Sequence, residues 1–453
     1  MKVAARSLLA FLLGLSPIST GLSQAQPART DPKPQILIHA ARSLDIRGGR
    51  YLQDAGILIA GDRIREVGRY TQIRQHAARA QVVELGGATV LPGLIDCHTH
   101  LLMTERIQKL LEMSTSERAL LGAAVARQAL EAGITTVRDA GNSGLNGDIA
   151  LRNGIRAGWV AGPRIFASGR ALSPAGGQFS AMDASIGPEI VAREYVPITT
   201  PEEARRAVAQ AAASAVDLIK VIVDTGLREN YTAVLDESIL RSIVEEAHRS
   251  RLKVAAHAIA NSAVRNAAEA GVDSIEHAYF ASDRNLRLMK EKGIYLVPTD
   301  SERPPAYYTD RLRRALQIGV KIAFGSDARG GALLKEGDKT FAERSIGTLL
   351  GYAKAGVAPI DILRMATLDA ADLLGWSDPP GAMEPAEERF TLDEATQWKD
   401  RLGAIEPDRY ADLIAVPGDP LVDIAEIRRV QFVMKLGVIA KNVLGAPGPG
   451  PGE

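Results

Sequence analysis

Short apolar runs alternate with amphipathic stretches through the middle of the chain. The runs are typical of buried strands and lie at 134–137, 218–223, 253–257, 274–277, 294–297 and 321–324. The stretches between them repeat at helical spacing, most clearly at 201–215, which Thr200 and Pro201 begin, and at 236–251. Alternating strands and helices imply a parallel sheet. We therefore predict an α/β fold, with residues 91–376 forming a (β/α)8 TIM-type barrel rather than a doubly wound sheet.

Both ends of the chain show a different pattern, that of a β-sheet without helices. Strand-like runs lie at 36–39, 56–60 and 64–67, with turns at 48–49 and 61–62, and two more lie at 411–416 and 430–434. We predict that residues 35–90 and 401–445 share one small β-sandwich beside the barrel. The polar segment 377–400 is predicted to be a surface insertion, and the Gly/Pro-rich end 446–453 to be a disordered tail.

The first 25 residues have the order of a secretory signal peptide. Lys2 and Arg6 give a positive start, residues 7–20 are mostly apolar, and Ser23-Gln24-Ala25 is a small-residue cleavage site. We predict cleavage after Ala25 and an exported protein, periplasmic or secreted; the alternative is a buried N-terminal helix. Cys97 is the only cysteine, so the mature protein has no intramolecular disulfide despite an oxidising destination.

The charge balance narrows the range of partners. Lys plus Arg equals Asp plus Glu at 54 each, so no summed field attracts nucleic acid or an anionic membrane. Beyond the signal segment no apolar run is long enough for a spanning helix. We expect a small-molecule substrate, no nucleic-acid partner and no membrane association after cleavage, and a homo-oligomer remains open.

Polar residues stand where the apolar strands end, which is where barrel enzymes place their chemistry. His98 and His100 are two apart on one strand, so both point to one side. His257, His277 and Asp327 each end a later strand. Imidazoles and a carboxylate suit a metal such as zinc. The pair at 98 and 100 alone is also compatible with two core or surface histidines.

Lys220 lies inside an apolar strand, where an ammonium group would be badly desolvated. Its pKa would fall, or it would find a partner. A neutral amine can take up CO2 as a carbamate, which can bridge two metal ions. The alternatives are a lysine that reaches the barrel mouth or one that pairs with Asp224. A further pairing that we expect is an internal ion pair between Arg138 and Asp139.

These residues in this order resemble the amidohydrolase superfamily from about residue 36 to 443. The segments 136–139, 274–278 and 325–327 are similar to its imidazolonepropionase-related branch, which includes Xaa-Pro dipeptidases and carboxypeptidases. The resemblance implies a binuclear centre. Its first metal would be held by His98, His100 and Asp327, its second by His257 and His277, and carboxylated Lys220 would bridge the two.

The resemblance and the ligand types together imply the chemistry. Two divalent metal ions, zinc by default, would hold a bridging hydroxide that attacks a carbonyl. Asp327 is the expected catalytic proton shuttle. The net positive site favours a carboxylate-bearing substrate, so we expect hydrolysis of a peptide-like amide bond in a dipeptide or N-acyl amino acid.

Four further residues are candidates for contact with the substrate. Arg228, Tyr231 and Arg329 are candidates for the substrate carboxylate, and Gln178 stands where relatives often carry a substrate-contacting histidine. Ala260 replaces a glutamate typical of the superfamily's mononuclear deaminases, which disfavours deamination. The alternatives are a lactonase, phosphotriesterase-like or xenobiotic amide or ester hydrolase on the same centre, and, more remotely, a non-catalytic barrel that binds a metal or ligand.

Overall fold

The computed structural model describes residues 35–104, 109–178, 187–225, 232–233, 235–330, 339–375 and 398–444. Several predictions fall outside these ranges: the signal peptide at 1–25, residues 377–397 of the insertion, the tail at 446–453, and the candidate contacts Arg228 and Tyr231. The last three residues of the predicted insertion, Trp398–Asp400, form a 3-10 helix (η3) in which Trp398 is buried.

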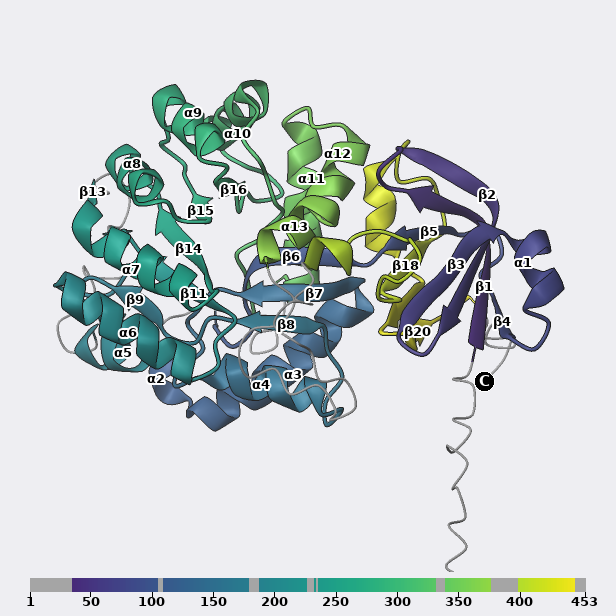
Figure 1. The fold of residues 1–453 in the computed structure, drawn as a ribbon, viewed down its shortest axis with the longest axis horizontal. Coiled ribbons are helices and arrows are strands. Elements are labelled where there is room, and N and C mark those ends of the chain that lie inside the picture. The colour runs from purple at the N-terminus through teal and green to yellow at the C-terminus, as the bar shows by residue number, and fades with distance from the viewer. Residues whose placement is uncertain are drawn as a thin grey trace, which may run out of the picture. The chain divides into compact units, whose positions relative to one another are not determined.

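Both ends of the described chain contribute to one mixed sheet, in which purple and yellow strands lie side by side (Figure 1). Its order is β20-β19-β18-β5-β1-β2-β3, and β4 pairs with β1. The central strand β5 is parallel to β1 and antiparallel to β18, which joins the two ends. The division of these strands into a two-layer sandwich stays a prediction. The strands are β1 Gln35–Asp45, β2 Arg50–Ala60, β3 Arg63–Arg69, β4 Gln81–Glu84, β5 Thr89–Pro92, β18 Leu413–Val416, β19 Phe432–Lys435 and β20 Val438–Asn442.

Apolar side chains on one face of this sheet form a shared core. Ile38 and Ile57 sit opposite each other on β1 and β2, and both are fully buried. They share a core with Leu413 and Phe432 from the C-terminal strands. Residues of opposite chain ends thus bury one apolar face, which gives the termini a reason to meet.

The barrel strands form a closed parallel ring. The ladders β6-β7-β8 and β11-β14-β15-β16 are parallel throughout. The Asp217 amide donates to the Ala167 carbonyl at 2.8 Å and joins β8 to the strand that begins at Leu218. Leu296 bridges Ile322, and the Cys97 amide donates to Phe324 O at 2.8 Å, so residues 321–327 close the ring. The strands are β6 Leu94–His100, β7 Ile134–Asp139, β8 Arg164–Ala167, β11 Leu218–Ile222, β14 Lys253–Ala258, β15 Ser274–His277 and β16 Tyr295–Val297.

Helices follow the strands and cover the ring from outside, as α6, α7 and α8 show for β11 and β14 (Figure 1). The predicted start at Thr200 is confirmed, since its hydroxyl accepts from the Glu203 amide and Pro201 occupies the first turn of α6. No described helix is long and apolar enough to span a bilayer. The helices after the barrel strands are α3 Thr115–Glu131, α4 Gly147–Arg156, α6 Pro201–Ala213, α7 Glu237–Arg249, α8 Asn261–Ala270, α9 Asp283–Glu291, α10 Ala306–Ile318, α11 Phe341–Lys354, α12 Pro359–Met365 and α13 Leu368–Leu374.

Short elements complete the described chain, and some line the ends of the barrel strands. The two-residue strand β17 pairs with the end of β6, and β12 pairs with β13 just after β11. Because all the ring strands point the same way, their carboxyl ends meet at one edge, where the predicted polar residues stand. These elements are α1 Tyr70–His76, α2 Lys109–Glu112, β9 Ala171–Ser173, α5 Gly187–Glu194, β10 Tyr195–Pro197, β12 Asp224–Thr225, β13 Thr232–Ala233, β17 Ala328–Arg329 and the 3-10 helix η4 Ile424–Arg429.

Candidate metal centre

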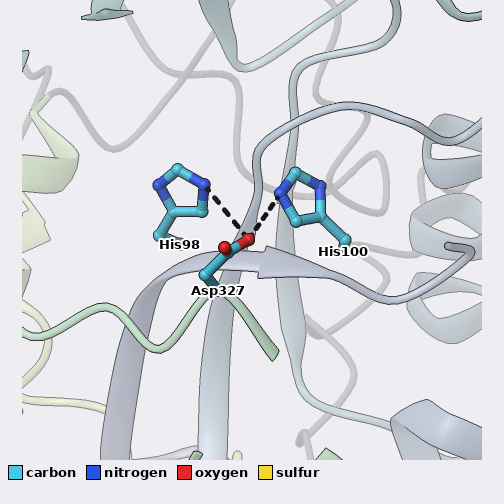
Figure 2. Close-up of side chains that lie close together, drawn as sticks. All are labelled: His98, His100 and Asp327. Carbon is cyan, nitrogen blue, oxygen red and sulfur yellow. Dashed lines mark ion pairs between the residues drawn. The ribbon is translucent and has the colours of Figure 1, made fainter. Parts of the chain in front are cut away.

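His98, His100 and Asp327 converge at the carboxyl end of the barrel (Figure 2). One ligand atom from each lies within 4.8 Å of the others. Asp327 Oδ1 is 3.1 Å from His100 Nε2 and 4.0 Å from His98 Nε2. The strand alternation that put both histidines on one side is therefore realised, and a carboxylate from the last strand faces them.

The Nδ1 atoms of His98 and His100 each have a hydrogen-bond acceptor. His98 Nδ1 lies 2.6 Å from Glu276 Oε2, and His100 Nδ1 lies 2.8 Å from the Gly141 carbonyl oxygen. An acceptor at Nδ1 fixes the proton there and leaves the lone pair of Nε2 directed at the cavity. Burial lowers the pKa of His98 to about 3, so this imidazole is neutral, as a metal ligand must be.

A buried carboxylate holds the strand that carries Asp327 against β6. Asp96 accepts from the Ser326 amide at 3.0 Å and from its hydroxyl at 2.6 Å. A Cβ on Gly325 would lie 2.3 Å from Val297 Cγ1 and 2.8 Å from His98 Cβ, so only glycine permits this approach. Asp327 itself has φ of 54°, a left-handed conformation that non-glycine residues rarely adopt. The Gly-Ser-Asp motif at 325–327 thus positions the carboxylate of Asp327 beside the two histidines.

Glu276 joins several parts of the centre, and its role was not apparent from the sequence. It is completely buried and accepts from Arg138 Nη2 at 2.8 Å as well as from His98. The predicted ion pair between Arg138 and Asp139 is wrong. Asp139 instead accepts from the Leu101 amide at 2.7 Å, because neighbouring residues of a strand point to opposite sides.

Lys220 lies in the same cavity and is 3% exposed. Burial lowers its pKa to about 8, an effect that nearby Glu276 opposes. The alternative pairing with Asp224 is not found, since the ion pairs among the described side chains do not include one between these two residues. Asp224 instead lies 3.5 Å from His257 Nε2. The amine is therefore held beside the histidines with a raised neutral fraction, the form that a carbamate requires.

His257 and His277 line the other side of the cavity, with ring centroids 4.6 Å apart. Burial lowers the pKa of each well below the usual value. His277 Nδ1 lies 2.7 Å from Thr299 Oγ1, whose hydroxyl donates to Pro298 O at 2.7 Å, so Nε2 of His277 is left as the free acceptor. His257 has the opposite orientation: Asp224 is near Nε2, and Gln178 Nε2 lies 3.4 Å from Nδ1.

The six predicted metal ligands line one cavity of about 160 Å³. Gln178 and Arg329, two of the four predicted substrate contacts, also line it. Tyr279 and Asn142 were not predicted: Tyr279 stands two residues after His277, a spacing that could have identified it, whereas Asn142 follows no strand pattern. The full lining is His98, His100, Met103, Asn142, Gln178, Lys220, His257, Ile259, His277, Tyr279, Asp327 and Arg329.

A second cavity of about 540 Å³ shares Asp327 and Arg329 with the first. Arg329 Nη2 lies 3.3 Å from Asp327 Oδ2. Burial would raise the pKa of Asp327, but Arg329 and His100 outweigh it and hold this pKa well below the usual value. Further cations on the wall of this cavity are Arg303, Lys339 and Arg344, beside the acids Glu302 and Glu343.

The remaining histidines, His39, His76 and His248, do not line the first cavity. His39 contacts Glu84 and Asp54, His76 contacts Glu66, and His248 contacts Asp273. His76 and His248 have side chains that are 57% and 44% exposed. These pairs occur at the surface and are structural.

Comparison with known proteins agrees with this geometry. Residues 89–387 match the amidohydrolase family. An ochratoxinase from Aspergillus niger is 27% identical over 488 aligned positions, which cover 96% of this chain and 92% of that protein. An imidazolonepropionase from Yersinia pseudotuberculosis is 26% identical, covering 75% of this chain and 87% of that protein.

Among solved structures, a Xaa-Pro dipeptidase with bound methionine in its active site has a TM-score of 0.72 at 27% identity, covering 89% of this chain and 99% of that one. The imidazoles, the carboxylate and their spacing belong to the same matched region. The chain therefore belongs to the amidohydrolase family, as a metal-dependent hydrolase of C–N bonds.

Proposed function

We propose that this protein hydrolyses the peptide-like amide bond of a dipeptide or N-acyl amino acid at a binuclear metal centre. The observation that carries the proposal is the convergence of four imidazoles, Asp327 and Lys220 on one cavity. The relatives support the bond type, since they include a Xaa-Pro dipeptidase.

The donor set fits two divalent ions. His98, His100 and Asp327 would hold one, His257 and His277 the other, and carboxylated Lys220 would be shared. Bound ions would lower the pKa of a shared water toward neutrality and polarise the substrate carbonyl. Zinc suits these ligands best.

Asp327 is placed to move the proton. Arg329 and His100 keep its carboxylate ionised, so it accepts the proton of the attacking water. It then delivers that proton to the leaving nitrogen, which departs as an amine while the acyl part becomes a carboxylic acid. The backbone of Asp327 is left-handed, and its carboxylate lies beside the imidazoles of His98 and His100.

Arg329 is the candidate partner of the substrate carboxylate. Its guanidinium lies at the junction of the two cavities, next to Asp327. A planar guanidinium accommodates a carboxylate through two hydrogen bonds. Binding there would hold the amine part of the substrate close to the group that protonates its nitrogen.

The test is metal content per chain, measured with a hydrolysis panel of dipeptides, N-acyl amino acids, esters and lactones before and after chelation. We expect about two metals per chain, amide hydrolysis that chelation abolishes, and recovery when zinc is restored. One metal per chain, or a preference for lactones, would contradict the proposal.

We also propose that the protein works outside the cytoplasm. The charged, apolar and small-residue order of residues 1–25 supports export. Mass spectrometry of the exported protein would then find Gln26 as the first residue; retention with an intact Met1 would contradict it.

A further inference from the structure

Four aromatic side chains form a continuous strip from the metal cavity to the surface. We call Tyr279, Phe280, Tyr307 and Tyr308 the aromatic strip. Tyr279 lines the cavity, and its ring centroid is 5.5 Å from that of His277. The strip connects the loop after β15 to the start of α10.

Ring geometry shows that the strip is continuous. Tyr279 and Tyr308 stack with centroids 3.7 Å apart and planes within 9°. Tyr308 meets Tyr307 edge to face at 4.6 Å, and Tyr307 stacks on Phe280 at 5.6 Å. The Tyr279 hydroxyl lies 3.1 Å from Thr299 Oγ1, which also holds His277. The inner end of the strip is therefore fixed to the metal centre itself.

The outer end of the strip is exposed. Phe280 and Tyr307 are each 47% exposed, so part of each side chain is accessible from solvent. Aromatic residues make up only 5% of the chain, yet four of them meet here. Contiguous exposed aromatic surface beside a cavity is characteristic of ligand binding.

We infer that the aromatic strip selects substrates whose acyl group carries a flat aromatic ring, which packs on Tyr279, Tyr307 and Phe280 during hydrolysis. This inference rests on the proposed function. It assigns the acyl side because Arg329, proposed to bind the carboxylate of the amine part, adjoins Asp327, whereas the strip begins beside His277. The two halves of the amide would thus extend toward different walls.

The experiment compares N-acetyl-leucine with N-benzoyl-leucine, which differ only in the acyl group. For the wild type we expect kcat/KM to favour the benzoyl compound. In Tyr307→Ala and Phe280→Ala the benzoyl-to-acetyl ratio should fall roughly 2- to 10-fold, and Tyr308→Phe, which keeps the ring, should retain it. Trp159→Ala is the matched control: Trp159 is 81% exposed and does not belong to the strip or line the cavity, so the ratio should not change.

A ratio that favours acetyl, or that the strip variants leave unchanged, overturns the inference while the proposed function stands. If neither compound is hydrolysed, the proposed function is decided by the substrate panel described above, and the inference is decided by calorimetric binding of the same two compounds to the metal-loaded protein. Tighter binding of N-benzoyl-leucine that Tyr307→Ala weakens would support the strip. Equal binding of both compounds would overturn it.

Discussion

Replacing Glu276 with glutamine should weaken metal binding, although Glu276 acts only through His98, whose imidazole it orients. The carboxylate is completely buried and receives hydrogen bonds from His98 Nδ1 at 2.6 Å, Arg138 Nη2 at 2.8 Å and the Ser274 hydroxyl at 2.5 Å. Glutamine has nearly the same size but one acceptor oxygen and no charge. Arg138 would lose its counter-ion, and either His98 Nδ1 or Arg138 Nη2 would face the amide NH2 group instead of an acceptor oxygen.

The size of the effect follows from these contacts. Removing one partner of a buried ion pair costs about 3–5 kcal/mol, and a hydrogen bond to a charged group contributes about 1.5–3 kcal/mol. Since glutamine keeps one acceptor, we expect the free energy of unfolding of the metal-free protein to fall by about 2–4 kcal/mol. Loss of the group that orients a metal-binding histidine should lower metal affinity about 10- to 100-fold.

Two measurements separate these effects. Urea denaturation of the metal-free protein gives the stability change without the stabilisation that bound metal adds. Competition with a chelator gives the metal affinity. Glu66→Gln is the matched control, because Glu66 also contacts a histidine, at 2.8 Å, but with side chains 44% and 57% exposed; it should change stability by less than about 1 kcal/mol and leave metal affinity unaltered.

The reasoning would be refuted by a Glu276→Gln protein that binds metal as tightly as the wild type. It would also be refuted if Glu66→Gln lowered metal affinity equally. Glu276→Asp provides a further check, since it keeps the charge at a shorter reach and should recover part of the lost affinity. If Glu276 had a purely structural role, Glu276→Gln and Glu276→Asp would both be less stable, but their metal affinities would not depend on whether the side chain is charged.

Three further predictions concern residues of the same cavity. The pKa of Lys220 falls from 10.5 to about 8 on folding, so between these pH values the unfolded state binds more protons than the folded state. The free energy of unfolding of the metal-free wild type should therefore rise by up to about 3 kcal/mol relative to that of Lys220→Met as the pH increases from about 8 to 10.5. Urea denaturation that gives parallel pH dependences for the two proteins would disprove this. Asp327→Asn should lower kcat about 100- to 10,000-fold with an unchanged circular dichroism spectrum, whereas near-normal turnover would exclude the shuttle role. Arg329→Met should lower kcat/KM for an N-acyl amino acid about 10- to 100-fold more than for the matching C-terminal amide, and an equal loss on both would remove Arg329 from carboxylate binding.

Periodicity was sufficient to predict most strands and to bring the six candidate ligands to one cavity. His98 and His100 converge because a strand repeats every two residues, and Asp327 joins them because parallel strands end at one edge. The strand Arg164–Ala167 was not predicted. The aromatic strip could not be predicted either: it unites the segments 279–280 and 307–308, which meet only when α10 packs beside the end of β15.

The mistaken pairing of Arg138 with Asp139 shows what a stricter use of the same rule would have given. Both residues lie on β7, and adjacent residues of a strand face opposite sides. A buried arginine facing the barrel interior must find a carboxylate on another strand, because an unpaired buried charge is too costly. Glu276, next to His277, is the acid at the matching level of β15, 138 positions away in the sequence. Burial and alternation together therefore require an acid on a facing strand, and that acid also orients a metal-binding histidine.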